Sequence, residues 1–146
     1  MGTSFTQYNK KGFWARDACL EVWLHFFTLE IEQMDRVPKW LESAKEHWHI
    51  QATVGFVGCI SPDLDRIADN PERRNLIIHI SKNALERLYA QGNILEQGYL
   101  NSLGIGGEGS YFAKDCQTSV FTVIGQKFVD LLEGNLSTDA SNSPVF

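Results

Sequence analysis

Polar and apolar positions recur with a helical period in the N-terminal part of the chain. Between residues 14 and 34, polar side chains appear at steps of three and four, and nearly every position between them is apolar. This pattern predicts a long helix with one narrow polar stripe. Because so wide an apolar surface needs neighbours on several sides, we expect this helix to lie at the centre of a bundle.

The second predicted helix begins at Pro38 and carries residues suited to a core at helical steps from Leu41 to Cys59. Its last part, 50–60, is also rich in β-branched residues and contains two glycines, which is typical of a strand. A strand there, with another at 118–124, would make the fold α+β. We expect a helix instead, because the face that begins at Leu41 continues to Cys59 without a break in phase.

The remaining helices are predicted mainly from their ends. Asn70 followed by Pro71 is typical of a helix start, and a glycine after the last apolar position is typical of a helix end. Residues 135–146 are mostly small and polar, which predicts a flexible tail. We therefore expect one domain, 1–134, with an all-α fold: an irregular bundle of about five or six helices around the long N-terminal helix. Its later helices are 71–91, 94–103 and 119–133.

Composition and charge narrow the classes of partner. The chain has 146 residues, of which 43% are hydrophobic, an ordinary balance for one soluble globular domain. Its formal charge is −5, and residues 93–146 contain two lysines against six acidic residues. Such a surface repels phosphate, so we expect neither nucleic acid nor a membrane as a partner, whereas a basic protein is favoured. Three cysteines without a paired motif, and no apolar leader, favour a cytoplasmic protein.

One loop, 104–117, has neither a helical nor an alternating pattern and is rich in glycine. Its first part matches G-x-G-x-x-G, in which glycines let backbone amides approach a pyrophosphate at a helix start. The context differs, because the match follows a predicted helix, opens into no helix and includes an acidic residue. We therefore expect no nucleotide cofactor here. The residues predicted to meet a ligand or partner are Gly104, Gly106, Gly107, Glu108, Gly109 and Tyr111.

Candidate residues for chemistry are few. Glu46 and His49 resemble half of the carboxylate–histidine motif of di-iron bundles, but the motif occurs once and faces away from the predicted core, so we expect no metal. Glu21, His25 and His79 become acid–base candidates only if the polar stripes of two helices line a shared cleft. On separate surfaces they would be ordinary solvated side chains. The sequence therefore leaves open whether the protein is an enzyme.

Two classes of function remain. The first is a protein-binding or regulatory module, of the adaptor or the inhibitor and immunity type, that meets a basic partner through its acidic surface. Phe13, Trp14 and Trp40, at predicted helix starts, are its candidate contact residues. The alternative is a small enzyme or small-molecule-binding protein with a pocket beside the 104–117 loop. A deep pocket at this loop would favour the alternative.

Overall fold

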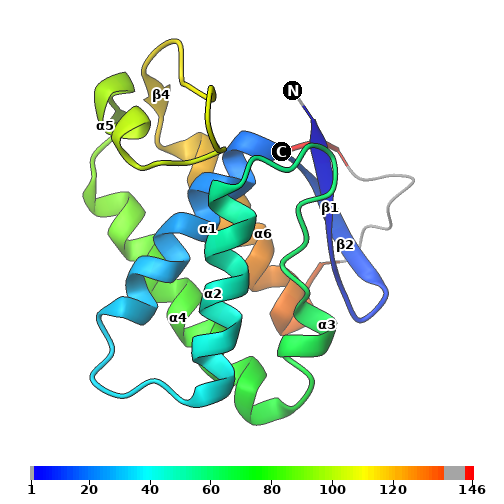
Figure 1. The fold of residues 1–146 in the computed structure, drawn as a ribbon. Helices are drawn as coiled ribbons and strands as arrows, with labels where there is room; N and C mark the ends of the chain where they lie inside the picture. The colour runs from blue at the N-terminus through cyan, green and yellow to red at the C-terminus, as the bar shows by residue number, and fades with distance from the viewer. Residues whose placement is uncertain (1, 137–143) are drawn as a thin grey trace.

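The computed structural model describes residues 2–136 and 144–146 (Figure 1). In this part of the chain the fold is mostly helical, with six helices and two small antiparallel sheets of two strands each. None of these helices is long and apolar enough to cross a membrane. The helices are α1 (Asp17–Glu32), α2 (Lys39–Thr53), α3 (Leu64–Ile67), α4 (Pro71–Ala90), α5 (Gln97–Ser102) and α6 (Ser119–Glu133). The strands are β1 (Thr3–Tyr8), β2 (Lys11–Arg16), β3 (Ile94–Leu95) and β4 (Cys116–Gln117).

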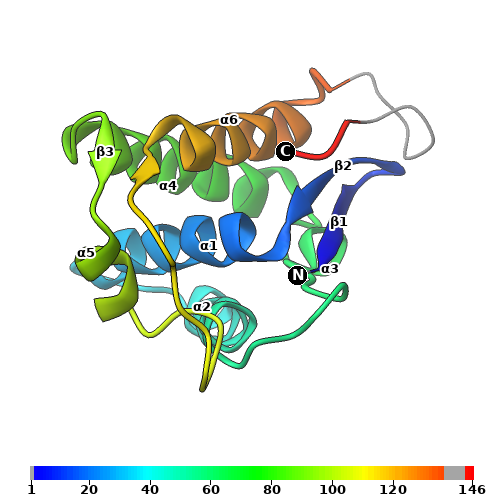
Figure 2. The same ribbon diagram turned by 90° about the horizontal axis from the view of Figure 1, so that it is seen from above.

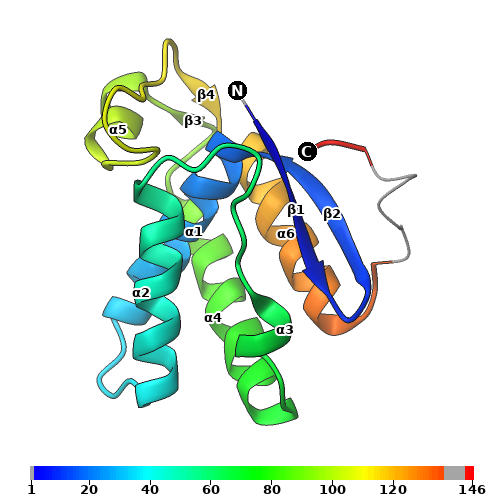
Figure 3. The same cartoon turned by 45° about the vertical axis from the view of Figure 1, so that its right-hand side comes forward.

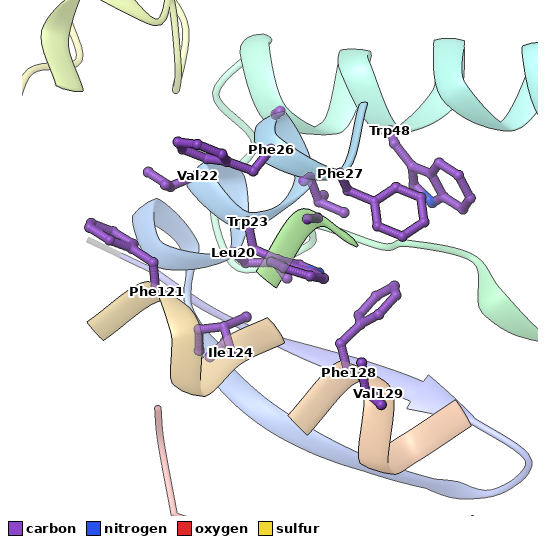
Figure 4. Close-up of a cluster of buried hydrophobic side chains, with 14 of the residues drawn as sticks. Leu20, Val22, Trp23, Phe26, Phe27, Trp48, Phe121, Ile124, Phe128 and Val129 are labelled. Atoms are coloured by element: carbon purple, nitrogen blue, oxygen red, sulfur yellow. The ribbon is translucent and has the colours of Figure 1, made fainter. Parts of the chain in front are cut away.

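Helix α1 lies at the centre of the fold, as its narrow polar stripe predicts. It contacts α2, α4 and α6, and Figure 2 shows these helices around it. The core between them is strongly aromatic: the ring of Phe27 lies 4.7 Å from Trp48 of α2 and 5.7 Å from Phe128 of α6 (Figure 4). Trp23 also contacts Phe128, at 5.6 Å between ring centroids. Large rings on one helix thus hold two neighbouring helices in place.

The N-terminal hairpin corrects the all-α prediction. Strands β1 and β2 pair in antiparallel register, and the two residues of the turn, Asn9 and Lys10, have φ values of 51° and 66°. Two positive φ angles are typical of the tight turn that suits the twist of a hairpin. The prediction missed β1 because its inward face carries polar residues, Ser4 and Thr6, which are both buried. As a result, α1 begins at Asp17 and not at residue 14.

The segment 50–60 is neither the continuous helix nor the strand that its pattern suggests. Helix α2 ends at Thr53, and residues 54–63 follow as a connection without helix or strand. Gly55 and Gly58 have φ values of 90° and 69°, a conformation that other residues rarely adopt. These glycines therefore end the helix and shape the connection. The strand alternative at 118–124 is also wrong, because α6 covers that segment almost entirely.

The other predicted helix ends agree closely with the structure. Asn70 caps α4 by accepting a hydrogen bond from the backbone N–H of Arg73 at 2.9 Å, and Pro71 is its first residue. Gly134 ends α6 with a φ of 79°. The segment 94–103 is shorter in helix than predicted, since β3 precedes α5 there.

The predicted tail, 135–146, lies partly outside the described residues, because 137–143 are not among them. Its described end runs beside β2 (Figure 3). The backbone N–H of Phe146 donates to the carbonyl of Trp14, and the N–H of Arg16 donates to the carbonyl of Phe146, both at 2.9 Å. The Phe146 ring contacts Phe13 and lies under the Lys127 ammonium group. These residues therefore contribute to the packing around the hairpin.

The crossing of α1 and α6 depends on Gly125. A Cβ atom at this position would lie 2.5 Å from Cζ3 of the buried Trp23 ring and 2.7 Å from Cδ2 of Leu85. No real Cβ atom approaches other atoms this closely, so the helices are as close as glycine permits.

We expect Gly125→Ala to lower the free energy of unfolding, because overpacking a core costs about 1–3 kcal/mol and exceeds the roughly 1 kcal/mol that alanine contributes to helix stability. Gly98→Ala in α5 is the matched control, since a Cβ there meets nothing within 4 Å. It should be neutral or slightly stabilising. Urea denaturation of both variants measures the difference. A Gly125→Ala protein as stable as the native chain would show that the two helices can separate without cost.

Candidate functional site

The glycine loop, residues 104–109, lies with its backbone directly against the end of α2. The N–H of Gly106 donates to the carbonyl of Ala52 at 2.9 Å. A Cβ on Gly107 would lie 2.5 Å from the carbonyl oxygen of Val54, and one on Gly55 would lie 2.4 Å from that of Gly106. Glycine is therefore required here for close backbone contact, and the positive φ angles of Gly106 and Gly107 add to that requirement.

The rest of the 104–117 loop, after the glycine loop, is attached to α5 mainly by side-chain hydrogen bonds. Asn101 makes two of them with Phe112: its Oδ1 accepts from the backbone N–H at 2.6 Å, and its Nδ2 donates to the carbonyl at 3.0 Å. Gln97 donates from Nε2 to the same carbonyl at 2.9 Å. Its backbone N–H donates to Asp115 at 2.8 Å. Both halves of the loop are thus fixed by hydrogen bonds to the helices beneath them.

A cavity of about 900 Å³ lies between this loop, the first turns of α1, the end of α2 and α5. Figures 1 and 3 both show these segments together at one end of the helix bundle. Its volume is within the range of pockets that hold small organic ligands. Most of the wall is apolar, including Ala18 of α1, Phe56, Leu100, Ile105 and Phe112.

Glu21 of α1 lines this cavity as a buried acidic residue without a hydrogen-bond partner at its Oε2 atom in the part of the chain that the structure describes. Its side chain is 5% exposed, and its Oε2 atom has no hydrogen-bond partner among the described residues. Burial, and to a lesser extent the nearby carboxyl group of Asp17, raise the pKa of the Glu21 carboxyl group from 4.5 to about 7. Glu21 can therefore hold or release a proton near neutral pH.

Asp17, one helical turn before Glu21, also lines the cavity but is fully paired. Its Oδ1 accepts from the Ser4 hydroxyl at 2.5 Å, and its Oδ2 accepts from the N–H of Gly58 at 2.8 Å. The Ser4 oxygen in turn accepts from the N–H of Ile60 at 3.0 Å. Asp17 therefore connects the hairpin, α1 and the 54–63 connection. Asp17 was not among the predicted site residues, because its position on the polar stripe predicts an exposed residue.

The predicted acid–base set does not assemble. Glu21 lines the cavity, but His25 and His79 do not. His79 is exposed on α4, with its Nε2 atom 3.4 Å from Asn83 of the same helix. His25 is partly buried, and burial lowers the pKa of its imidazole. The three residues therefore do not share a cleft.

The predicted loop residues do come to the site. Gly104, Gly106, Gly107, Glu108, Gly109 and Tyr111 all line the cavity. Glu108 is exposed, and Tyr111 is 76% exposed, so both lie where the cavity meets solvent. The glycine match follows α5 and opens into no helix, so it lacks the helix N-terminus that binds phosphate in that motif.

Three further candidate residues for metal or nucleophile chemistry are Glu46, His49 and Cys116. The described residues contain no group of three or more His, Cys, Asp or Glu side chains placed to hold a metal ion. Glu46 and His49 are both exposed on α2. Cys116 lines the cavity, but burial raises the pKa of its thiol, which lowers the fraction of the nucleophilic thiolate.

Comparison with known proteins gives no further guide. The chain matches no protein-family model, no curated protein and no solved structure.

Because the pKa of Glu21 is raised in the folded state, we expect the free energy of unfolding to depend on pH. The folded state holds the proton up to about pH 7, whereas the unfolded chain loses it near 4.5. Between these values the folded state binds more protons, so the free energy of unfolding falls as pH rises and then levels off. We expect Glu21→Gln to remove this fall and to be more stable than the native chain above pH 7, by about 3 kcal/mol.

Chemical denaturation at pH 5 and pH 8 measures this effect. Glu46→Gln, an exposed position on α2, is the control and should follow the native pH dependence. If Glu21→Gln and the native chain lose stability in parallel between the two pH values, the carboxyl group does not titrate in the folded cavity as described.

Proposed function

We propose that the protein binds a small molecule in the cavity beneath the glycine loop. The observation that carries the proposal is the buried carboxyl group of Glu21, which lines the cavity and whose Oε2 atom has no partner. Burying such a group without a partner destabilises the fold, and a neutral side chain would avoid the cost. A ligand that pairs with the carboxyl group explains why an acidic residue lies there.

The walls of the cavity support the same role. They are mainly apolar with a small number of polar groups, which is the usual make-up of a ligand pocket. The loop that covers it is held by hydrogen bonds at Gly106 and at Phe112. A wall that is already ordered loses little conformational entropy when a ligand binds. A small-molecule-binding protein with a pocket beside the 104–117 loop is therefore the function that we propose first.

A protein-binding or regulatory role is the second candidate. Phe13 is buried, and Trp40 is partly covered by the Arg73 guanidinium group, so these two residues offer little contact surface. However, Val57 and Tyr111 line the cavity and are 71% and 76% exposed. With the acidic Glu108 nearby in the lining, they form a surface that suits a basic partner.

We also propose that the protein is cytoplasmic. Cys19, Cys59 and Cys116 are all free thiols, which supports a reducing compartment.

A screen of small molecules tests the proposed function. We expect some members of a metabolite and fragment library to raise the melting temperature of the native chain, because a ligand that binds only the folded state stabilises it. Ala18→Phe, which places a ring in the cavity from the second residue of α1, should abolish these shifts. Its circular dichroism spectrum and melting temperature should remain close to native, because Ala18 is not in the buried core.

The outcomes separate the two candidates. Shifts that persist in Ala18→Phe would place the binding elsewhere and reject this cavity. An absence of hits, together with a protein partner that co-purifies at low salt and is lost at high salt, would favour the second candidate.

A further inference from the structure

Acidic groups dominate the charged lining of the cavity. The titratable side chains that line it are Asp17 and Glu21 from α1, with Glu108, Tyr111, Lys114 and Cys116 from the loop and β4; α5 and the end of α2 contribute none. Among the described residues, the lining thus contains three carboxyl groups and only one amino group, that of Lys114. None of the ion pairs among the described residues includes Glu21. An anionic ligand would meet repulsion here, and a cationic one would be attracted.

The hydrogen-bonding groups of Gly106, Ser110 and Asp17, which line the cavity with Glu21, have other partners. Gly106 passes over the carboxyl group, since a Cβ atom there would lie 3.5 Å from Oε2. Its N–H donates to Ala52, and the hydroxyl of Ser110 donates to the carbonyl of Gly106 at 2.6 Å. Asp17 accepts hydrogen bonds from the Ser4 hydroxyl and from the N–H of Gly58. Oε2 of Glu21 thus has no hydrogen-bond donor among the described residues, and a bound ligand can supply one.

We propose that the ligand of this cavity is an organic amine, whose protonated nitrogen pairs with Glu21 while its apolar body packs against Phe56, Leu100 and Phe112. This inference rests on the proposed function and specifies its ligand class. An ammonium group supplies the N–H donors and the positive charge that the carboxyl group lacks. The aromatic rings of the lining add attraction for a cation that lies over their faces.

If Glu21 pairs with an amine, the affinity for the amine depends on pH. An adjacent cation lowers the pKa of Glu21, which is about 7 in the free protein. Binding below pH 7 therefore releases a proton, and affinity rises with pH until Glu21 is ionised in the free protein. An aliphatic amine with a pKa of about 10 stays charged through this range. The dissociation constant should be about tenfold larger at pH 6 than at pH 8.

The test uses ligands that differ only in their polar group. A set of small aryl and alkyl skeletons is prepared as amine, alcohol and carboxylate, for example phenethylamine, phenethyl alcohol and phenylacetate, or hexylamine, hexanol and hexanoate. Ligand-observed NMR and calorimetry measure their binding to the full chain at pH 6 and pH 8. We expect the amines to bind at least about tenfold more tightly than their matched alcohols, and the carboxylates to bind least.

Two variants assign the effect to its residue. Glu21→Gln should weaken amine binding at least about tenfold at pH 8, where Glu21 is ionised, and remove the pH dependence, because the titrating partner is gone. Glu108→Gln removes an exposed charge from the same lining and should weaken binding only two- to threefold or so, with the pH dependence retained. Proton release measured by calorimetry in two buffers of different ionisation enthalpy gives a readout that does not depend on affinity.

The outcomes distinguish this inference from the proposed function. If alcohols or carboxylates bind in the cavity as well as the amines, and Ala18→Phe blocks them, the cavity is a binding site but its ligand class is not an amine. If amines bind equally well to Glu21→Gln, the inference is also wrong. If no skeleton binds while the library gives shifts that Ala18→Phe abolishes, the inference is wrong and the proposed function stands; if neither the skeletons nor the library bind, both fail.

Discussion

The carboxylate of Asp17 is the constraint on which the arrangement of the cavity depends. It accepts from Ser4 of β1 and from Gly58 of the 54–63 connection while it occupies the first turn of α1. Three segments of the chain are therefore held together by one buried carboxyl group. Its charge is favourable there, because the first turn of a helix presents unpaired N–H groups and the positive end of the helix dipole. Removing it would leave the buried Ser4 hydroxyl without an acceptor.

The contrast between Asp17 and Glu21 shows how the fold supports a binding site. Both carboxyl groups lie on one face of α1, one turn apart, and both are more than nine-tenths buried. Both oxygens of Asp17 accept hydrogen bonds from the protein. One of these bonds comes from Gly58 and fixes the 54–63 connection against the start of α1. That connection then meets the glycine loop through Gly55 and Gly106 and closes one wall of the cavity. The second carboxyl group, left with an unpartnered oxygen, lies inside the space that the first helps to create.

Sequence patterns predicted the parts of the fold that local rules control. The cap at Asn70, the glycine at Gly134 and the central position of α1 follow from periodicity and end signals. The hairpin was missed because Ser4 and Thr6 are polar yet buried, and only tertiary hydrogen bonds explain Ser4. Similarly, the glycine loop and Glu21 were found as separate candidates. Their juxtaposition depends on backbone contacts between segments about fifty residues apart, which no periodicity records.

The unpaired carboxyl group also links stability to ligand binding. Above pH 7 the free protein carries a buried charge without a partner, which lowers its stability but leaves the cavity ready to accept a cation. A ligand that pairs with Glu21 removes this unfavourable term, and the free energy recovered adds to its affinity. Trp23 and Phe27 pack with other rings in the core and do not line the cavity, so burial of these apolar rings stabilises the free state independently of the site. Stability and recognition are thus assigned to different parts of α1: its central turns build the core, and its first turns hold the charge that a ligand would meet.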